Sequence, residues 1–214
     1  MTHAKPVARP PRRRLPPDDR RDALIAAALD LFNNSLYDDV SVDGLAAAAG
    51  ASRTLIYHYF GGKTGLFVAA VRQAGDQLLT AIDAAAAADP DNWLNGCIEA
   101  FLGSVDANPL GLTTLLRRGS LPGGADRQIL DEIRAKILKR ILAVLDPPTD
   151  SAVLRAVLLG WIAMTETLCT QWLQDQQPTR SQLRTLLPEL LRATLAAAAW
   201  HDPSVAAVLS KIPR

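Results

Sequence analysis

Apolar residues recur at intervals of three and four along most of the chain, which is the spacing of one face of an α-helix. Ala and Leu dominate the composition and only 5% of the residues are aromatic, a balance that favours helices over sheets. The first helix is predicted over 19–33. Its apolar face is formed by Ala23, Leu24, Ala27, Ala28, Leu31 and Phe32. The pattern predicts an all-α protein.

Two short helices are predicted next, separated by a tight turn. Ser41 is a favourable N-cap for the first of them, Gly50 ends it, and Ser52 caps the second only two residues later. Two helices joined by a short turn that contains glycine form a helix-turn-helix unit. The sequence therefore predicts a three-helix, helix-turn-helix domain at 18–67.

A long helix is predicted over 63–88, and it leads into a larger helical domain at 68–214. Proline, glycine and aspartate mark the breaks in this domain. The helices expected between the breaks lie at 92–107, 110–118, 124–145, 150–175, 180–199 and 203–211. Pro188 falls inside the penultimate helix, where we expect a bend or a local irregularity.

Positive charge is concentrated at the N-terminus. The formal net charge of the chain is +1, but residues 1–21 contain seven Lys and Arg against two Asp and are rich in proline. Such a segment buries too little apolar surface to fold. We therefore expect a disordered basic arm at 1–17, which either keeps the chain soluble or contacts nucleic-acid phosphates.

The third helix combines polar reading groups with a cluster of aromatic residues. In a helix-turn-helix, the first turn of the second helix faces the base edges of the major groove. Arg53 is the strongest reader there, because a guanidinium can bind O6 and N7 of guanine. The rings that follow can donate to phosphate oxygens, although each could instead be an ordinary surface or core-edge residue. The predicted DNA-binding residues are Ser41, Val42, Ser52, Arg53, Thr54, Leu55, Tyr57, His58, Tyr59 and Lys63.

The stretch 40–67, VSVDGLAAAAGASRTLIYHYFGGKTGLF, resembles the DNA-binding domain of the TetR family of bacterial transcriptional regulators. The close motif covers about 21–67, and the rest of the chain matches only as an all-helical pattern of suitable length. Thr54 and Leu55 stand where the family often has a small pair such as Gly-Thr, so no base preference is carried over. The matching positions are Gly50, Ser52, Ile56, Tyr57, Tyr59, Phe60, Lys63 and Leu66.

The resemblance implies a homodimer on a palindromic, double-stranded DNA operator, in the bacterial cytoplasm and associated with the nucleoid. The helices near 150–175 and 180–199 would form the dimer interface. Residues 152–173 support this independently, because they are apolar on more than one face. Gly160 would allow close helix approach, and Trp161 and Trp172 are residues of the type that anchors interfaces. The alternative is a core helix within one subunit.

The resemblance also implies a small-molecule effector, bound between the fourth helix and the helices that follow it. Few charges lie in these helices, so an apolar or amphipathic effector is expected. The segment from Arg117 to Gly124 is either a mobile gate, an anion site or solvated surface. The residues expected to line the pocket are Trp93, Cys97, Phe101, Leu112, Leu116, Ile137, Trp161, Met164 and Leu168.

Other classes of function find less support. The cysteines, Cys97 and Cys169, and the three histidines are scattered, so no metal, disulfide or cofactor is expected. The N-terminus does not have the pattern of a signal peptide, and the nine-residue apolar run at 156–164 is too short for a bilayer, so no membrane is expected.

The prediction is a ligand-responsive transcriptional regulator, with repression as the expected mode. An architectural DNA-binding protein is the first alternative, although residues 22–214 carry a net charge of −4. An all-helical enzyme is the second, although no nucleophile–base pair, metal spacing or phosphate loop is present. The carboxylates considered for it are Glu99, Asp106, Asp131, Glu132, Glu166 and Asp175, with Glu166 the one of most interest.

Overall fold

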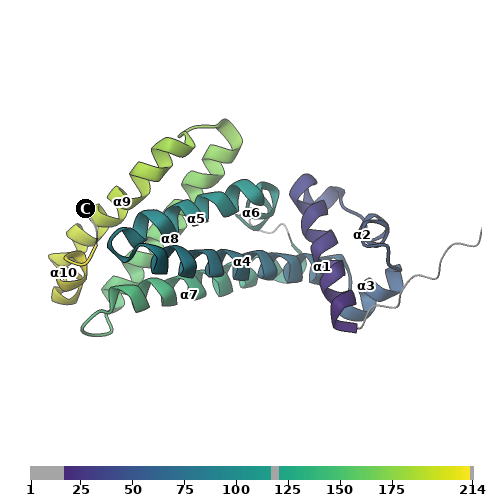
Figure 1. Ribbon diagram of the computed structural model, residues 1–214, viewed down its shortest axis with the longest axis horizontal. Helices are drawn as coiled ribbons and strands as arrows, with labels where there is room; N and C mark the ends of the chain where they lie inside the picture. The colour runs from purple at the N-terminus through teal and green to yellow at the C-terminus, as the bar shows by residue number, and fades with distance from the viewer. Residues whose placement is uncertain (1–16, 117–120, 213–214) are drawn as a thin grey trace, which may run out of the picture.

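The computed structural model describes residues 17–116 and 121–212, and every regular element in these two ranges is helical (Figure 1). The predicted all-α class is therefore confirmed. The α-helices are α1 (Pro17–Asn34), α2 (Val42–Ala48), α3 (Arg53–Phe60), α4 (Lys63–Ala88), α5 (Trp93–Ala107), α6 (Pro109–Leu116), α7 (Ala125–Leu145), α8 (Ala152–Asp175), α9 (Arg180–Ala199) and α10 (Pro203–Leu209). The 3-10 helices are η1 (Tyr37–Asp39), η2 (Pro90–Asn92) and η3 (Pro122–Gly124).

Most helix ends lie within two residues of the predicted ones. Pro17, which was assigned to the basic arm, is the first residue of α1, while residues 1–16 of that arm lie outside the described residues. The segment from Arg117 to Gly124, for which a gate, an anion site and solvated surface were considered, also lies partly outside them, and its described end forms η3. Pro188 is buried inside α9, which continues as one helix on both sides of it.

Side-chain caps start the two short helices as the sequence predicted. The Ser41 hydroxyl accepts a hydrogen bond from the Gly44 amide at 2.9 Å, and the Ser52 hydroxyl accepts one from the Leu55 amide at 3.3 Å. Between them, Gly50 has a φ of +59°, and the Ala51 amide donates to the Ala46 carbonyl at 2.8 Å. This left-handed ending of α2 is favourable for glycine and turns the chain directly into α3.

The first hydrophobic core holds α1, α2, α3 and the beginning of α4 together. Its members include Leu24, Phe32, Leu45, Ile56 and Phe67, each with less than a twentieth of its surface exposed. Ile56 and Phe60 of α3 belong to the same core as the buried residues of α1 and α2, with Phe60 partly buried. We call α1–α3 and this part of α4 the reading domain.

A second core fills the remaining helices, which we call the large domain. In Figure 1, α4 runs from the reading domain along the large domain, with α7 beside it. The second core is built mainly from α5, α7, α8, α9 and α10. Leu121, just before η3, and Ile129, in the second turn of α7, belong to the first core, so two segments of chain join the domains. The predicted boundary after residue 67 falls inside α4.

The helix α8 is long and apolar enough to cross a membrane by length and composition, with a mean hydropathy of 1.5. Its apolar character thus extends beyond the nine-residue run noted in the sequence. However, Leu154, Leu158 and Cys169 are fully buried against other helices, and Glu166 forms an ion pair inside the protein. These contacts are those of a core helix in a helical bundle.

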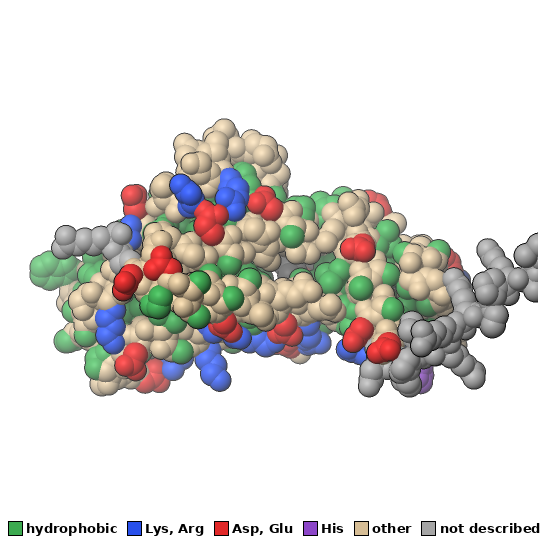
Figure 2. Space-filling model, in the orientation of Figure 1, with side chains coloured by type: hydrophobic (Ala, Val, Ile, Leu, Met, Phe, Trp, Pro, Cys, Tyr) green, Lys and Arg blue, Asp and Glu red, His purple; other side chains and the backbone are tan. Residues whose placement is uncertain are grey.

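Ion pairs follow the line along which α4 and α7 meet. Arg72 lies 2.9 Å from Glu132, Lys136 lies 2.7 Å from Asp76, and Arg140 lies 2.9 Å from Asp83. Figure 2 shows basic and acidic side chains interspersed along this edge of the molecule. Successive members of these pairs are four or seven residues apart on α4 and four residues apart on α7. This spacing keeps the charges of each helix on one face.

Candidate nucleic-acid interface and ligand cavity

The first turn of α3 presents its polar side chains to solvent. Arg53 and Thr54 are exposed, as are the capping residues Ser41 and Ser52. Leu55 and Val42 are half-buried and pack partly against the first core. A helix N-terminus with exposed donors is suited to a groove lined with bases and phosphates.

The next turn of α3 carries the aromatic residues. Tyr57 is 51% exposed and His58 is also exposed, whereas Tyr59 is half-buried and packs against the first core. The rings of His58 and Tyr59 meet edge to face, with centroids 5.1 Å apart. Tyr57 and His58 therefore have free access to a ligand, while Tyr59 is shared between the core and the surface.

Lys63, at the start of α4, contacts the protein itself. Its Nζ donates to the Tyr37 carbonyl oxygen at 3.0 Å and lies 4.1 Å from the centroid of the Tyr37 ring. The Tyr37 hydroxyl lies 2.8 Å from the Thr64 hydroxyl. An ammonium has three donors, so Lys63 can hold η1 against α4 and still reach a phosphate. The sequence did not predict the contact between Tyr37 and Thr64, because the two residues are 27 positions apart.

Two further contacts shape the reading surface and were also missed. Asp43, in the first turn of α2, lies 3.3 Å from the Arg53 guanidinium and so links the two short helices. The Arg21 guanidinium lies 5.5 Å from the centroid of the Phe60 ring and links α1 to the end of α3. An acidic residue at the second position of α2 is also favoured by the helix dipole, so the sequence alone points to that simpler role.

Gly65 fixes the approach of α4 to α3. A Cβ atom on this residue would lie 1.8 Å from the Phe60 carbonyl oxygen, far inside the contact distance of the two atoms. No side chain can be accommodated there without moving the backbone of one helix. The angle between the reading helix and the long helix therefore depends on a single absent methyl group.

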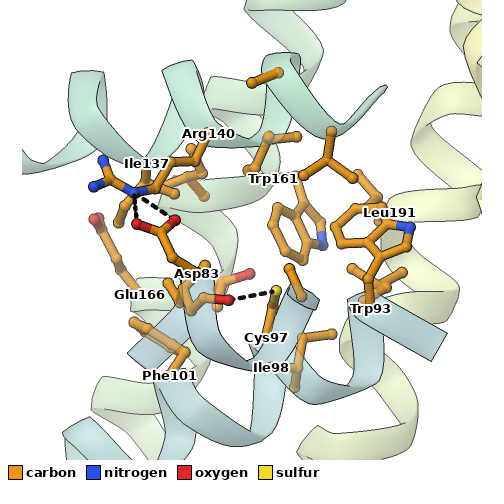
Figure 3. A pocket seen from close by; sticks show the side chains of 18 residues that line it. Asp83, Trp93, Cys97, Ile98, Phe101, Ile137, Arg140, Trp161, Glu166 and Leu191 are labelled. Atoms are coloured by element: carbon orange, nitrogen blue, oxygen red, sulfur yellow. Dashed lines mark hydrogen bonds and ion pairs between the residues drawn. The ribbon is translucent and has the colours of Figure 1, made fainter. Parts of the chain in front are cut away.

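The large domain contains an apolar cavity of about 190 Å³ between α4, α5, α7 and α8, which we call the α4–α8 cavity (Figure 3). Figure 3 shows Trp93 and Trp161 on one side of it, and Asp83, Arg140 and Glu166 on the other. The predicted pocket residues that line it are Trp93, Cys97, Phe101, Ile137 and Trp161.

Four residues expected in the pocket do not line this cavity. Leu112 on α6 lines a smaller cavity of about 90 Å³, next to α1 and α4, and Leu116 lines neither. Met164 and Leu168 pack against the second core and do not line the cavity. Trp161, Ile162 and Thr165 occupy the cavity side of α8 and Met164 lies on a different side, whereas Leu168 shares that side but lies about one turn further along the helix.

The charged groups of the cavity are neutralised in pairs. Glu166 is buried and accepts two hydrogen bonds from Arg134 Nε, at 3.1 and 3.2 Å, and a further one from Arg134 Nη2. This carboxylate raises the pKa of the Arg134 guanidinium. Glu166 thus joins α7 to α8 through an ion pair. The sequence analysis expected few charges in these helices and did not predict these ion pairs.

Cys97 projects into the cavity as a neutral thiol. Its Sγ donates to the Ile82 carbonyl oxygen at 3.7 Å. Burial, and then the Asp83 carboxylate, raise the pKa of the Cys97 thiol to about 11. Both cysteines are free, and no group of His, Cys, Asp and Glu suited to a metal ion occurs in the part of the chain that the structure describes.

An exposed apolar surface covers neighbouring faces of α8 and α9. On α8, Val153 and Leu159 are 38% and 39% exposed. Beyond the end of α9, Trp200 is 90% exposed. Trp161 and Trp172 are 8% and 7% exposed, so the prediction that they anchor a partner is wrong: both rings point into their own subunit. We call the face formed by Val153, Ala156, Leu159, Gly160, Ala193, Ala197 and Trp200 the α8–α9 face.

Comparison with known proteins agrees with both halves of this description. Residues 24–70 match the model of bacterial regulatory proteins of the tetR family, and residues 90–194 match the model of the tetracyclin repressor-like C-terminal domain. The HTH-type transcriptional activator FasR of Mycolicibacterium smegmatis is 24% identical over 172 residues, which are 77% of each chain.

Solved structures show the same fold. A tetR-family transcriptional regulator from Streptomyces coelicolor superposes with a TM-score of 0.78 and 30% identity, over 91% of this chain and 88% of that one. FadR from Bacillus subtilis, in complex with stearoyl-CoA, superposes with a TM-score of 0.60 and 19% identity, over 81% of this chain and 96% of that one. At that identity the second likeness concerns the fold alone.

These matches replace the two alternatives considered from the sequence. Members of the matched family are DNA-binding transcriptional regulators and not enzymes, and they act on operator DNA and small-molecule effectors. As soluble bacterial regulators they belong in the cytoplasm. With a helix-turn-helix at one end and a cavity-bearing helical domain at the other, this chain belongs to the TetR family of bacterial transcriptional regulators.

Proposed function

We propose that the chain is a nucleoid-associated repressor that binds a palindromic operator as a homodimer and releases it when an apolar small molecule enters the α4–α8 cavity. The observation that carries the proposal is the position of α4. Leu66 and Phe67 near its start are buried in the core beneath α3, while Ile82 and Asp83 near its other end line the cavity. A ligand that displaces α4 therefore also displaces α3.

The exposed edge of α3 supports the reading role. Arg53 and Thr54 on the first turn would face the bases, and Tyr57 and His58 on the next turn would donate to phosphates. Asp43 would hold the guanidinium of Arg53 near the groove until a base replaces it. Ser41, Ser52, Tyr59 and Lys63 would contact the backbone at the edges of the same surface.

The α8–α9 face supports the homodimer. Exposed apolar side chains on two packed helices, with a tryptophan at 90% exposure beyond the end of α9, are unfavourable in water, and association through a twofold axis is the commonest way to cover them. A Cβ atom on Gly160 would meet nothing within 4 Å in the subunit, which leaves room for a helix of a second copy. A twofold dimer would place its two copies of α3 about one DNA turn apart, roughly 34–36 Å.

The cavity supports an apolar effector. Tryptophan, phenylalanine and isoleucine side chains dominate its lining. FadR, a fold neighbour, was crystallised with stearoyl-CoA. A long acyl chain does not fit a cavity of about 190 Å³, so we expect a more compact ligand here. A difference of a few kcal/mol in its affinity for the two positions of α4 is enough to release the operator.

Binding to the DNA upstream of the chain's own reading frame tests the proposal. By fluorescence anisotropy, we expect that fragment to bind at least about a thousandfold more tightly than scrambled DNA of equal length. Arg53→Ala should weaken specific binding by about 10- to 100-fold, because a bidentate base contact contributes about 1–3 kcal/mol. Lys139→Ala, which removes an exposed cation on α7, is the matched control and should have little effect.

Two results would contradict the proposal. Equal and steeply salt-dependent affinity for both fragments, and for a library of selected sites, would show that binding is independent of sequence. A ligand that occupies the cavity at saturation without changing operator affinity would show that the cavity does not control α3.

A further inference from the structure

The volume of the α4–α8 cavity limits the size of its ligand. It is about 190 Å³ and is lined by side chains from five helices, including Leu191 of α9. An engineered protein cavity of about 150 Å³ is large enough to bind benzene. The cavity therefore accommodates a compact molecule of about one or two rings, and flat indole side chains from Trp93 and Trp161 line one side of it (Figure 3).

The charged side chains around the cavity are already paired with one another, so none is available to pair with a charged ligand. Asp83 is paired with Arg140 at 2.9 Å, and Glu166 is paired with Arg134. No other Asp, Glu, Lys or Arg lines the cavity among the residues that the structure describes. A charged ligand would lose its hydration and would have to break one of these pairs, which is costly in an apolar site. The lining of the cavity therefore favours an uncharged ligand.

Most of the polar groups that reach the cavity are already used within the protein. The Trp161 indole N–H donates to the Leu187 carbonyl oxygen at 3.0 Å, and the Cys97 thiol donates to the Ile82 carbonyl oxygen at 3.7 Å. Thr165 is the exception. This residue is 6% exposed and lines the cavity, and its Oγ1 has no hydrogen-bond partner within the described ranges 17–116 and 121–212.

A buried hydroxyl without a partner costs free energy, which a ligand can restore by pairing with it. Most helical threonines can satisfy their hydroxyl on the carbonyl oxygen one turn earlier, as Thr167 and Thr170 do on the same helix at 2.9 Å. Thr165 does not form that bond, so the hydroxyl of this cavity-lining residue is buried and has no partner among the described residues.

We propose that the cavity binds a compact, uncharged ring molecule with one hydrogen-bonding group, a hydroxyl or a carbonyl, which pairs with Thr165 Oγ1. A hydroxyl such as that of threonine both donates and accepts, so either group is suitable. The inference rests on the proposed function, because it names the class of effector for the same site. It makes Thr165 the residue that distinguishes such a ligand from a hydrocarbon of the same shape.

Three probes of one shape test the proposal: β-naphthol, naphthalene and β-naphthoate. Their binding to the full chain, without DNA, can be followed by quenching of tryptophan fluorescence and by calorimetry. We expect β-naphthol to bind most tightly, naphthalene about fivefold more weakly because one hydrogen bond is lost, and β-naphthoate at least about tenfold more weakly because it is charged. Palmitate, a long-chain probe, should not compete with β-naphthol.

Two variants locate the hydrogen bond. Thr165→Val keeps the shape and removes the hydroxyl, so it should bring the affinity for β-naphthol down to that for naphthalene and leave naphthalene binding unchanged. Thr165→Ser keeps the hydroxyl and should preserve the preference for β-naphthol. Because the wild-type hydroxyl is unpaired, Thr165→Val should fold at least as stably as the wild type, which thermal unfolding verifies.

The proposal is overturned if β-naphthoate or palmitate binds as tightly as β-naphthol, if no probe binds, or if Thr165→Val leaves the preference for β-naphthol intact. These outcomes are separate from the proposed function, because they are measured without DNA. If β-naphthol binds as expected but operator affinity does not respond, the ligand class stands and the repressor mechanism fails. If operator binding is specific but no probe binds, the proposed ligand class fails and the proposed DNA-binding function stands.

Discussion

The reading domain and the large domain place their functional residues in opposite environments. On α3, Arg53, Thr54 and Tyr57 are exposed. Their positions follow from the short length of this helix, which Ser52 caps at its N-terminus and Gly61 at its C-terminus. In the large domain, Trp93 and Trp161 are buried around an internal cavity that five helices form together. A surface site of the first kind depends on local spacing, whereas a cavity of the second kind depends on tertiary packing. The two regions should therefore respond differently to substitution.

Gly65→Ala should have the largest effect and should separate the two regions. The added methyl group would overlap the Phe60 carbonyl oxygen, so we expect a loss of about 3 kcal/mol or more of unfolding free energy, together with the loss of operator binding. The large domain should keep its cavity and its ligand. Urea unfolding and anisotropy measure these effects.

Gly103→Ala on α5 is the matched control for that change. A Cβ atom on Gly103 would meet nothing within 4 Å, so the substitution should stabilise α5 by up to about 1 kcal/mol and leave operator binding intact. If Gly65→Ala binds the operator like the wild type, the close approach of α3 and α4 is not what positions the reading helix.

The reactivity of Cys97 should show how closed the cavity is. Because burial raises the pKa of this thiol to about 11, its thiolate is scarce at pH 8 and increases as the pH approaches 11. In the Cys169→Ala variant, alkylation of Cys97 at pH 8 should be about a hundredfold slower than that of a thiol with an ordinary pKa, and a cavity ligand should slow it further. Mass spectrometry measures the rate of this reaction. Fast alkylation at pH 8 would mean that water fills the cavity.

Trp200→Ala should weaken the proposed homodimer without altering the reading surface. A central tryptophan in an interface typically contributes about 2 kcal/mol or more, so the dimer dissociation constant should rise about 30-fold. Sedimentation equilibrium measures this change. Leu36→Ala is the control, because it removes an exposed apolar side chain that lies in the reading domain and not in the large domain. It should leave the dimer unchanged. If both variants dimerise like the wild type, the α8–α9 face is not the interface.

Arg72→Gln should have the smallest effect, because it removes one exposed pair between α4 and α7. A hydrogen bond from Arg72 lowers the pKa of the Glu132 carboxyl. The pair therefore stabilises the fold above the ordinary pKa of a glutamate, and its contribution is lost as the pH falls through the lowered value. Thermal unfolding of wild type and variant should differ at pH 7 and converge at acidic pH. A difference that persists at acidic pH would assign the effect to packing.

The sequence was most informative where structure is local. The caps Ser41 and Ser52 and the turn at Gly50 could be assigned from residue type and spacing, and the structure forms the expected hydrogen bonds. Lys63 was harder, because its contact with Tyr37 bridges 26 residues. A motif indicates which residues occur together but not the partners that fold back onto them.

The large domain was less predictable because its helices are apolar on several sides. Periodicity could not determine which side of α8 faces the cavity, so Met164 and Leu168 were expected there and Thr165 was not. For the same reason Trp172, which is buried, was expected at an interface, and the exposed Trp200 was not. Only the packed structure distinguishes these positions.

The length of α4 has a mechanical consequence. Lys63 at its start and Asp83 beside the cavity are 20 residues apart, which corresponds to about 30 Å of helix at a rise of 1.5 Å per residue. If α4 moves as a rigid rod that pivots beside Asp83, each degree of tilt shifts its first turn by about 0.5 Å. A ligand of one or two rings would thus need to rotate the rod by only a few degrees to carry the guanidinium of Arg53 out of hydrogen-bonding range of a base.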